Sequence, residues 1–536
     1  MYDRTFIIDS NNLSKVKSKL FGYMITDDGD IYIDKIPNNI SDTGLFSLIE
    51  KKNNKIIIRQ DFCASFGLFL YKKDDYFIIS NSFIKLIENI NDKLTINKLV
   101  FDSILYVDDA YILNHDTLVK EIYKLSSDEF ITIDIDTGNL NIEKKDYIYY
   151  KRLFDCKDSF DLLDKWYYKW VNVFRNMVKN NYPITCDLSG GLDTRVILSM
   201  LRNANIDINS SIKMQSHTKV NLDKDKEDMR ISEEIASDLG IELNSDKSLK
   251  MMNVGSLSIE DVYSSSKYTS FGSSNLTKYS KNLYKDTLFS IKGIGSTTKG
   301  GFWHRVRVPI RYYTKRYGCY RINENVLYKI YNSLKKTKIK LYYKRVVSEL
   351  LKGYKHEESH KATLLYKKMM IENRDSLKAL DWMSGNNIII SPFFDPLIAE
   401  FDYNPYNDDI LYLNTLILDR YDSTLLKYDI EGRVFNSNTL KNVHILNNKY
   451  PVEKKKYSKL KKKQIVVERE TLNNEELGSY IENIYKSGDF KDKICKYIDE
   501  ETYNYILNNT DKNKINMKAQ SINNLLTLYE VLNNIN

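Results

Sequence analysis

Residues 188–194 read Leu-Ser-Gly-Gly-Leu-Asp-Thr and lie between a short apolar stretch and a helical pattern. Two adjacent glycines let backbone N–H groups approach an anion closely, because no Cβ stands in the way. A helix that begins directly after them presents its free N–H groups and the positive end of its dipole to the same anion. Ser189 and Thr194 add hydroxyl donors, and Asp193 is suited to hold a Mg²⁺ ion that bridges phosphates. The segment therefore predicts a loop that binds pyrophosphate.

The same segment argues against ordinary ATP hydrolysis. The GxxxxGK[ST] motif does not occur in the chain, and no lysine follows Gly190 and Gly191. A GxxxxGK[ST] loop serves cleavage that releases the terminal phosphate, whereas a Ser-Gly-Gly-x-Asp loop is suited to hold pyrophosphate as it leaves. An ordinary strand-to-helix turn also needs glycine, but the full seven-residue string disfavours that interpretation. We therefore expect ATP, with Mg²⁺, to activate a carboxylate as an acyl-adenylate.

The surrounding pattern predicts the elements that position this loop. An apolar strand is expected over residues 183–188, and a helix over 195–203. Strand–helix alternation continues along the chain, which is typical of a parallel, doubly wound sheet. The other expected strands span residues 209–214 and 288–291, and the other expected helices span 159–179 and 226–239. The chain is expected to be mainly helical over 323–387, with a second helical stretch over 410–427.

Residues 1–150 differ, because short strands and hairpin turns dominate there. Asp27-Asp28-Gly29 and Asp136-Thr137-Gly138 have the composition of hairpin turns between apolar strands. We therefore predict an α/β protein of three parts, with boundaries near residues 150 and 450. The parts are a strand-rich domain over 1–150, an ATP-binding domain over 151–450 and a helical extension over 451–536.

The loop resembles the LSGGxD[ST] segment in the synthetase domain of the asparagine synthetase family. Residues 390–395, Ile-Ser-Pro-Phe-Phe-Asp, are similar to the family's Pro-Phe-Leu-Asp segment, and Gly293-Ile294-Gly295 is similar to the glycine turn that closes over the adenylate. Residues 61–71 followed by 77–82, and residues 117–125, are similar to the family's glutamine-amidotransferase half. The resemblance implies a degenerate Ntn-type αββα sandwich, as in class II glutamine amidotransferases. A doubly wound parallel-sheet synthetase domain of the PP-loop (adenine nucleotide α hydrolase-like) type, with helical additions, would follow it.

The resemblance also implies which residues bind ATP and Mg²⁺. Asp193 would hold the metal, and no catalytic base can be assigned. The residues expected at ATP or its pyrophosphate are Leu188, Ser189, Gly190, Gly191, Asp193, Thr194, Met214, Gly293 and Gly295.

Three positions depart from the family pattern. Tyr2 stands where the family's glutaminase has its nucleophilic cysteine, so glutamine hydrolysis by that mechanism is not expected. Residues 296–299 read Ser-Thr-Thr-Lys where the family usually has an Asp-Glu pair, and its Asp helps to hold Mg²⁺. Ile388 and Ile390 stand where the family often has Glu and Arg, so a carboxylate that would assist the attacking amine is missing from its usual place.

These features lead us to expect an AMP-forming carbon–nitrogen ligase without glutaminase activity. Its substrates would be a small-molecule carboxylate and either ammonia or an amine, with a sugar acid of surface-polysaccharide synthesis as the preferred class. A cyclase of the lasso-peptide or β-lactam type is one alternative. A non-catalytic nucleotide-binding scaffold is the other, and the departures from the family pattern favour it.

The composition and charge of the chain indicate which ligands suit it and where in the cell it works. The net charge is 80 − 72 = +8 over 536 residues, which suits an anionic ligand but does not demand nucleic acid. The five cysteines are too scattered for a metal knuckle or a CxxC pair. No stretch approaches the roughly 18 apolar residues of a membrane helix, and no secretory signal is visible at the start. We therefore expect a cytoplasmic protein with no membrane span and no nucleic-acid partner.

Overall fold

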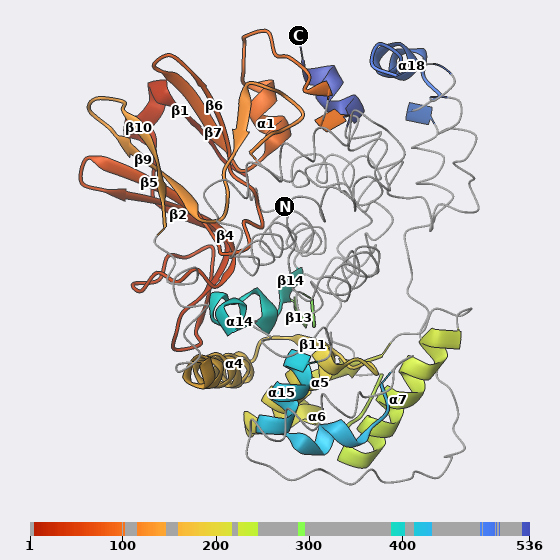
Figure 1. The fold of residues 1–536 in the computed structure, drawn as a ribbon. Coiled ribbons are helices and arrows are strands. Elements are labelled where there is room, and N and C mark those ends of the chain that lie inside the picture. The colour runs from red at the N-terminus through yellow and green to blue at the C-terminus, as the bar shows by residue number, and fades with distance from the viewer. Residues whose placement is uncertain are drawn as a thin grey trace, which may run out of the picture.

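The structure is a computed structural model, and it describes residues 5–98, 100–101, 115–145, 159–216, 223–244, 288–294, 387–401, 412–430, 483–484, 486–498, 500, 503 and 528–535. These residues form a mixed α/β protein with two antiparallel sheets and one parallel sheet. Figure 1 shows the antiparallel sheets stacked at the upper left and the parallel sheet, with its helices, below them. The domain boundaries expected near residues 150 and 450 lie outside the described residues.

The N-terminal part is a sandwich of two antiparallel sheets. Its interior is apolar because alternate residues of each strand point inward, as Ile56 and Ile58 do opposite Ile131 and Ile133. The first sheet has the order β1 (Ile7–Asp9), β7 (Tyr76–Ser80), β6 (Phe69–Lys73) and β8 (Ile122–Lys124). The second has the order β10 (Leu140–Lys144), β9 (Glu129–Asp134), β5 (Lys55–Gln60), β4 (Gly44–Lys52), β2 (Lys19–Ile25) and β3 (Ile31–Ile33). Short helices η1 (Ser10–Lys15) and α1 (Phe83–Glu88) follow β1 and β7.

The parallel sheet has the order β12 (Ile212–Gln215), β11 (Ile184–Asp187), β13 (Leu288–Ile291) and β14 (Asn387–Ile390). The chain therefore moves outward from β11 to β12 and then crosses to the other side of β11 for β13. The expected parallel sheet is confirmed, and β11 and β13 define the point where the strand order reverses. Ligands of such sheets bind at the carboxyl ends of the strands at this point.

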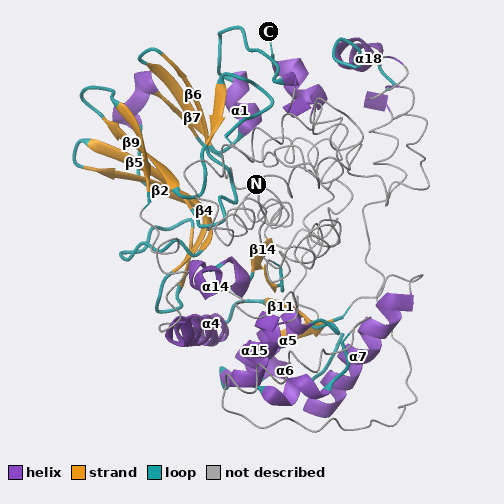
Figure 2. Ribbon diagram, in the orientation of Figure 1, coloured by secondary structure: helices purple, strands orange, loops and turns teal. Residues whose placement is uncertain are grey.

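Helices surround the parallel sheet (Figure 2). The long helix α4 (Ser159–Lys179) buries Trp166, Trp170 and Phe174, which recur every four residues and so share one face. It packs against α5 (Leu192–Asn203) and α14 (Pro396–Phe401), and α15 (Tyr412–Tyr421) also packs on α5. The remaining described helices are α6 (Ile208–Ser211), α7 (Asp223–Leu239), η5 (Pro392–Phe394), η6 (Ser423–Lys427) and α18 (Gly488–Ile494).

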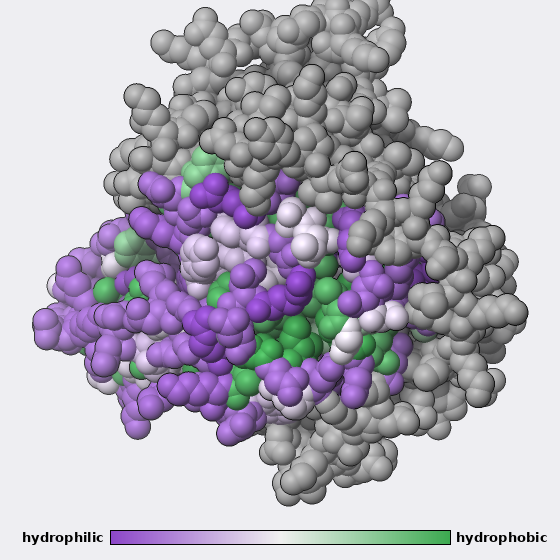
Figure 3. Space-filling view, turned by 90° about the horizontal axis from the view of Figure 1, so that it is seen from below, coloured by the Kyte–Doolittle hydropathy of each residue, from purple (hydrophilic) through white to green (hydrophobic). Residues whose placement is uncertain are grey.

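One hydrophobic core joins the sandwich to the parallel sheet. Tyr23 and Phe62 of the sandwich belong to the same buried cluster as Trp166 of α4 and Ile389 of β14. The Tyr23 hydroxyl donates to the Ile389 carbonyl at 2.6 Å. The two parts are therefore packed as a unit. Figure 3, seen from below, shows hydrophobic surface in the middle of this face with hydrophilic residues beside it.

Several expected elements are confirmed, and others differ in detail. Both hairpins form, and the helices over 159–179 and 226–239 are present. The loop helix begins at Leu192 rather than residue 195, because Gly191 in extended conformation already serves as its N-cap. Residues 208–211 form α6, and only then does β12 begin, since Asp207 caps a helical turn with its side chain. The helical stretch expected over 323–387 lies outside the described residues except for Asn387, which begins β14 and pairs with β13.

None of the helices in the described part of the chain combines the length and the apolar character that a bilayer crossing needs.

Candidate functional site

The loop of residues 188–191 joins β11 to α5 at the carboxyl edge of the parallel sheet. Its first residue, Leu188, is buried, and its N–H donates to the Gln215 carbonyl at the end of β12. The loop therefore continues the sheet for one residue before it turns into the helix. The strand–turn–helix context expected for residues 188–194 is present, and it lies at the point where the strand order reverses.

Hydrogen bonds within the loop fix its shape. The Ser189 N–H donates to Thr194 Oγ1 at 3.1 Å, and the Gly191 N–H donates to Ser189 Oγ at 3.2 Å. The two hydroxyl oxygens lie 3.1 Å apart, within hydrogen-bonding distance. Ser189 and Thr194 thus hold the turn together, and the sequence did not reveal this second use of their hydroxyl groups.

Asp193 is packed between two glycines from separate segments. A Cβ on Gly191 or on Gly293 would overlap the Asp193 carboxylate, so a side chain at either position would displace that carboxylate. Burial raises the pKa of the Asp193 carboxyl, against the backbone N–H groups of Asp193 and Thr194 and the charge of Arg195, which lower it. A cation placed here would favour the charged carboxylate. The structure therefore brings together the candidate metal ligand and the glycine after β13.

Gly190 shows that an anion is accepted at the loop. Its N–H donates to a carboxylate oxygen of Asp228 on α7, which the sequence did not single out. A Cβ at Gly190 would lie 2.9 Å from that oxygen and 3.1 Å from Ile231 Cδ1. The loop and α7 are therefore in close contact, and the Gly190 N–H can receive a phosphate oxygen only when Asp228 gives up this position.

Arg195, two residues after Asp193, carries a positive charge beside the loop but donates its hydrogen bonds to backbone carbonyls. Its side chain is fully buried, and the guanidinium donates to the carbonyls of Gly190 at 2.8 Å and Tyr428 at 3.1 Å. The Leu425 and Asp429 carbonyls also accept hydrogen bonds from it. Burial lowers the pKa of Arg195 to about 10. The side chain therefore ties the loop to the segment after α15 and faces backbone carbonyls.

A lysine and an aspartate that the sequence did not mark lie at the same edge. Lys292, the first residue after β13, forms an ion pair with Asp187 at the end of β11. Asp187 Oδ1 also accepts from Gln215 Nε2 at 2.8 Å. The sequence gives the same signal for both residues: each is a polar residue at the end of an apolar strand. In a parallel sheet such residues lie at the carboxyl edge.

The remaining candidate residues are less informative. Met214 is fully buried in the core beneath this edge, next to Cys186 on β11. Its side chain therefore packs against the sheet, and only its backbone is near the strand end. Gly295 and the segment 296–299 lie outside the described residues.

The Pro392–Asp395 part of the family-like segment forms the junction with the sandwich. Asp395 is fully buried and accepts hydrogen bonds from Trp170 Nε1 at 3.0 Å and Thr43 Oγ1 at 3.4 Å. Lys169 Nζ lies 3.0 Å from the same carboxylate, and the Leu397 N–H donates to its other oxygen at 2.9 Å. The donors come from the sandwich, α4 and α14, so this carboxylate has a structural function.

The loop region fits a polyphosphate and a magnesium ion. Because residues 190, 191 and 293 are glycines, the Asp228 and Asp193 carboxylates pack directly against their backbone, and a loop N–H already binds a carboxylate oxygen. Among the described side chains there is no group of three or more potential metal ligands. A Mg²⁺ ion beside Asp193 would therefore take most of its oxygen ligands from the nucleotide and water, as Mg²⁺ commonly does.

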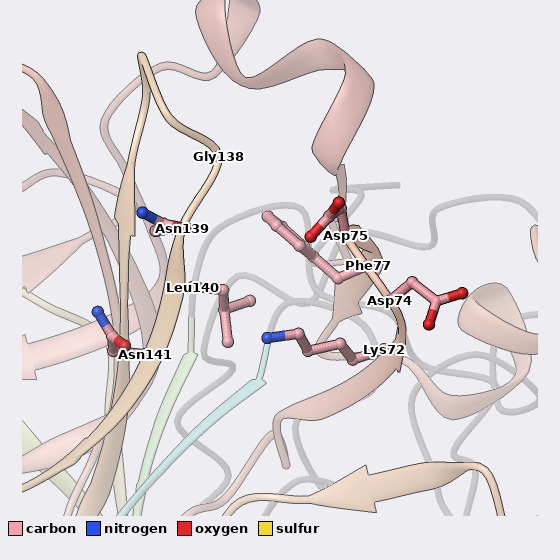
Figure 4. A pocket seen from close by; sticks show the side chains of 8 residues that line it. All are labelled: Lys72, Asp74, Asp75, Phe77, Gly138, Asn139, Leu140 and Asn141. Carbon is pink, nitrogen blue, oxygen red and sulfur yellow. The ribbon is translucent and has the colours of Figure 1, made fainter.

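The sandwich contains a separate cavity of about 320 Å³ between two hairpin turns (Figure 4). Lys72 points across it toward Leu140, whereas Asp74 points away. The cavity lies at the tips of β6–β7 and β9–β10, at the end of the molecule away from β11 in Figure 1. Its lining does not belong to the loop site.

Comparison with known proteins adds no assignment. No protein-family model matches the sequence, and no curated protein matches it. The chemistry proposed for this chain therefore depends on its residues and their geometry.

Proposed function

We propose that this chain activates a carboxylate with ATP and Mg²⁺ as an acyl-adenylate and transfers the acyl group to ammonia or an amine. The observation that carries the proposal is the contact of the Ser189–Thr194 turn with Gly293. It combines an anion-binding loop, a carboxylate and a second glycine segment at the reversal point of a parallel sheet.

Each group has a role in this reaction. Backbone N–H groups of Gly190 and Gly191 hold the β- and γ-phosphates, which leave as pyrophosphate. Asp193 positions Mg²⁺, which would supply charge neutralisation at the phosphates when bound. Glycine at position 293 keeps the Asp193 carboxylate in place. Among the residues that the structure describes, none is assigned as the base that deprotonates the attacking amine.

We propose that the chain is related to the asparagine synthetase family, because its segments at 188–194, 293–295 and 390–395 resemble motifs of that family. Two stacked antiparallel sheets at residues 7–144 are compatible with a degenerate glutamine-amidotransferase domain of the Ntn type. A parallel sheet with a Ser-Gly-Gly turn after its first strand is compatible with a PP-loop synthetase domain. We keep a cytoplasmic setting and a sugar acid as the acyl substrate as parts of the proposal.

A non-catalytic nucleotide-binding scaffold is the second candidate. One observation favours it: Ile388 and Ile390 of β14 are buried apolar residues at the positions where the family often has Glu and Arg, so neither can assist the attacking amine. This candidate predicts nucleotide binding without chemistry.

Pyrophosphate exchange separates the ligase, the scaffold and the cyclase. The protein is incubated with ATP, Mg²⁺, labelled pyrophosphate and pools of sugar acids, amino acids or peptides. The ligase predicts carboxylate-dependent exchange that Asp193→Ala abolishes. Tight ATP binding without exchange on any pool supports the scaffold, exchange with peptides alone supports a cyclase, and the lack of ATP binding contradicts all three.

A further inference from the structure

We propose that Lys292 binds the polyphosphate of ATP and supplies part of the positive charge that Mg²⁺ would otherwise provide; this inference rests on the proposed function. Lys292 follows β13, and the next residue, Gly293, packs against Asp193. Strand β13 is hydrogen-bonded to β11, which continues into the phosphate loop. Lys292 and the loop therefore face each other across the point where the strand order reverses.

The Lys292 ammonium is held in this position by the sheet edge. Its side chain is 10% exposed and contacts the Asp187 carboxylate, whose other oxygen accepts from Gln215 Nε2 at 2.8 Å. The Lys292 N–H also donates to the Ile390 carbonyl of β14 at 2.9 Å, which fixes the backbone. A nearly buried ammonium with fixed surroundings loses little further conformational freedom when it binds a ligand.

Charge balance explains why a cation is needed here. Asp187 at the end of β11 and Asp193 at the start of α5 place two carboxylates beside the loop. ATP would bring more negative charge to the same edge. Arg195 is turned toward the Gly190 and Tyr428 carbonyls, so its guanidinium does not face this edge. The Lys292 ammonium, already on Asp187, can bridge that carboxylate and a phosphate oxygen.

The alternative is that Lys292 only neutralises Asp187. The chain offers a matched control for this possibility in the sandwich. Lys145 pairs with Asp42 at 2.7 Å, with side chains 11% and 27% exposed, compared with 10% and 26% for Lys292 and Asp187. Lys145→Met therefore removes an ion pair of similar burial that lies outside the loop site.

The test is an ATP titration by calorimetry on the full chain, once with excess EDTA and once with excess Mg²⁺. We expect Lys292→Met to weaken ATP binding on the order of 10- to 100-fold in EDTA. With Mg²⁺ the loss becomes smaller, because the metal replaces the missing charge. Lys292→Arg keeps most of the affinity, and Lys145→Met binds ATP like the wild type. Asp187→Asn, which removes a repelling charge, binds ATP at least as tightly as the wild type in EDTA.

Wild-type ATP affinity in Lys292→Met under both conditions would overturn the inference and leave the proposed function intact. Equal weakening in Asp187→Asn and Lys292→Met would also overturn it, because the ion pair rather than the ammonium would then matter. If Lys292→Met does not fold, the double variant Lys292→Met with Asp187→Asn, which leaves no unpaired charge, takes its place. Weaker ATP binding in EDTA by the double variant than by Asp187→Asn alone supports the inference, and equal binding by the two overturns it. No ATP binding by the wild type would overturn the proposed function together with this inference.

Discussion

Asp193 and Asp395 both follow strands of the same parallel sheet, yet their surroundings differ completely. Asp395, after β14, is fully buried and has Lys169, Trp170 and Thr43 around its carboxylate. Asp193, after β11, is partly buried, and two glycine positions leave room for its oxygens. After β14 the protein itself supplies hydrogen-bond donors and a cation for the Asp395 carboxylate. After β11 two glycines lie against the Asp193 carboxylate, whose pKa is raised by burial.

The difference separates a carboxylate that stabilises the fold from one that would face a ligand in the proposed reaction. A buried carboxylate with a cation and neutral donors has the partners that it needs for stability. A carboxylate whose pKa is raised by burial is less stable in its charged form until a cation arrives. The two residues are connected through Ser391, whose hydroxyl donates to the Ile294 carbonyl at 2.5 Å. The junction therefore supports the glycine segment that contacts Asp193.

The junction should be the most sensitive point for stability. We expect Asp395→Ala to lower the free energy of unfolding by about 3–5 kcal/mol, because Lys169 remains buried without its carboxylate. The Lys169 side chain is only 5% exposed. Urea unfolding followed by circular dichroism measures the change.

A double variant and an exposed ion pair serve as controls for this prediction. Lys169→Met combined with Asp395→Leu should recover much of the loss, since no unpaired charge remains. Glu500 forms an ion pair with Lys491 at the surface, where the two side chains are 64% and 46% exposed, respectively. Glu500→Gln should therefore leave the urea midpoint unchanged. If Asp395→Ala instead removes pyrophosphate exchange at little cost in stability, Asp395 belongs to the active site and the comparison fails.

A third carboxylate, that of Asp61 in the sandwich, makes the stability of the fold depend on pH. It is fully buried, accepts from the N–H groups of Phe46, Cys63 and Ser65, and burial raises its pKa to about 6. The folded state therefore retains this proton to higher pH than the unfolded state does. Stability from this group is fully present below the unfolded pKa of 3.8 and is lost as pH rises through about 6. The loss amounts to roughly 3 kcal/mol.

Asp61→Asn lacks this titration. The difference in unfolding free energy between the wild type and Asp61→Asn should therefore shrink as pH rises from about 4 to about 7. Urea unfolding of both proteins at several pH values measures it. Parallel pH dependence of the two proteins would mean that the N–H donors keep Asp61 ionised throughout, as a cation does.

The sequence predicts some of the local elements that carry these carboxylates, but not the distant residues that pair with them. The 188–194 loop could be predicted because an apolar strand, two glycines and a helix occur consecutively. Strand β14 was missed, since the four residues Asn-Ile-Ile-Ile show no period that separates a strand from a helix. Lys169 with Asp395, and Lys292 with Asp187, are distant in sequence and come together only through tertiary packing.

Gly293 gives a direct test of the space around Asp193. A Cβ at Gly293 would overlap the Asp193 carboxylate, so Gly293→Ala should displace it. We expect a loss of about 1–3 kcal/mol in unfolding free energy from the added volume. If the proposed reaction is right, pyrophosphate exchange falls by about 100-fold, because small displacements of a positioned group have large effects on rate.

Gly488→Ala is the control for Gly293→Ala, because a Cβ there meets nothing within 4 Å. It should change neither stability nor exchange measurably. Full exchange activity in Gly293→Ala, measured on folded protein, would show that the position of Asp193 does not matter for the reaction.

The smallest effect is expected where a carboxylate and a cation meet near the surface. Arg420 on α15 donates from Nε and Nη2 to Asp164 on α4 at 2.8 and 2.7 Å, and the side chains are 30% and 33% exposed. Arg420→Lys loses the two-pronged contact, yet solvent screening limits the cost to about 1 kcal/mol or less. Arg420 lowers the pKa of Asp164, so this stability is present above the unfolded pKa of 3.8 and is lost as pH falls below it. Urea unfolding at neutral and acidic pH should show the variant and the wild type converging in acid. A loss as large as that of Asp395→Ala would mean that geometry, rather than burial, determines what a carboxylate contributes to this fold.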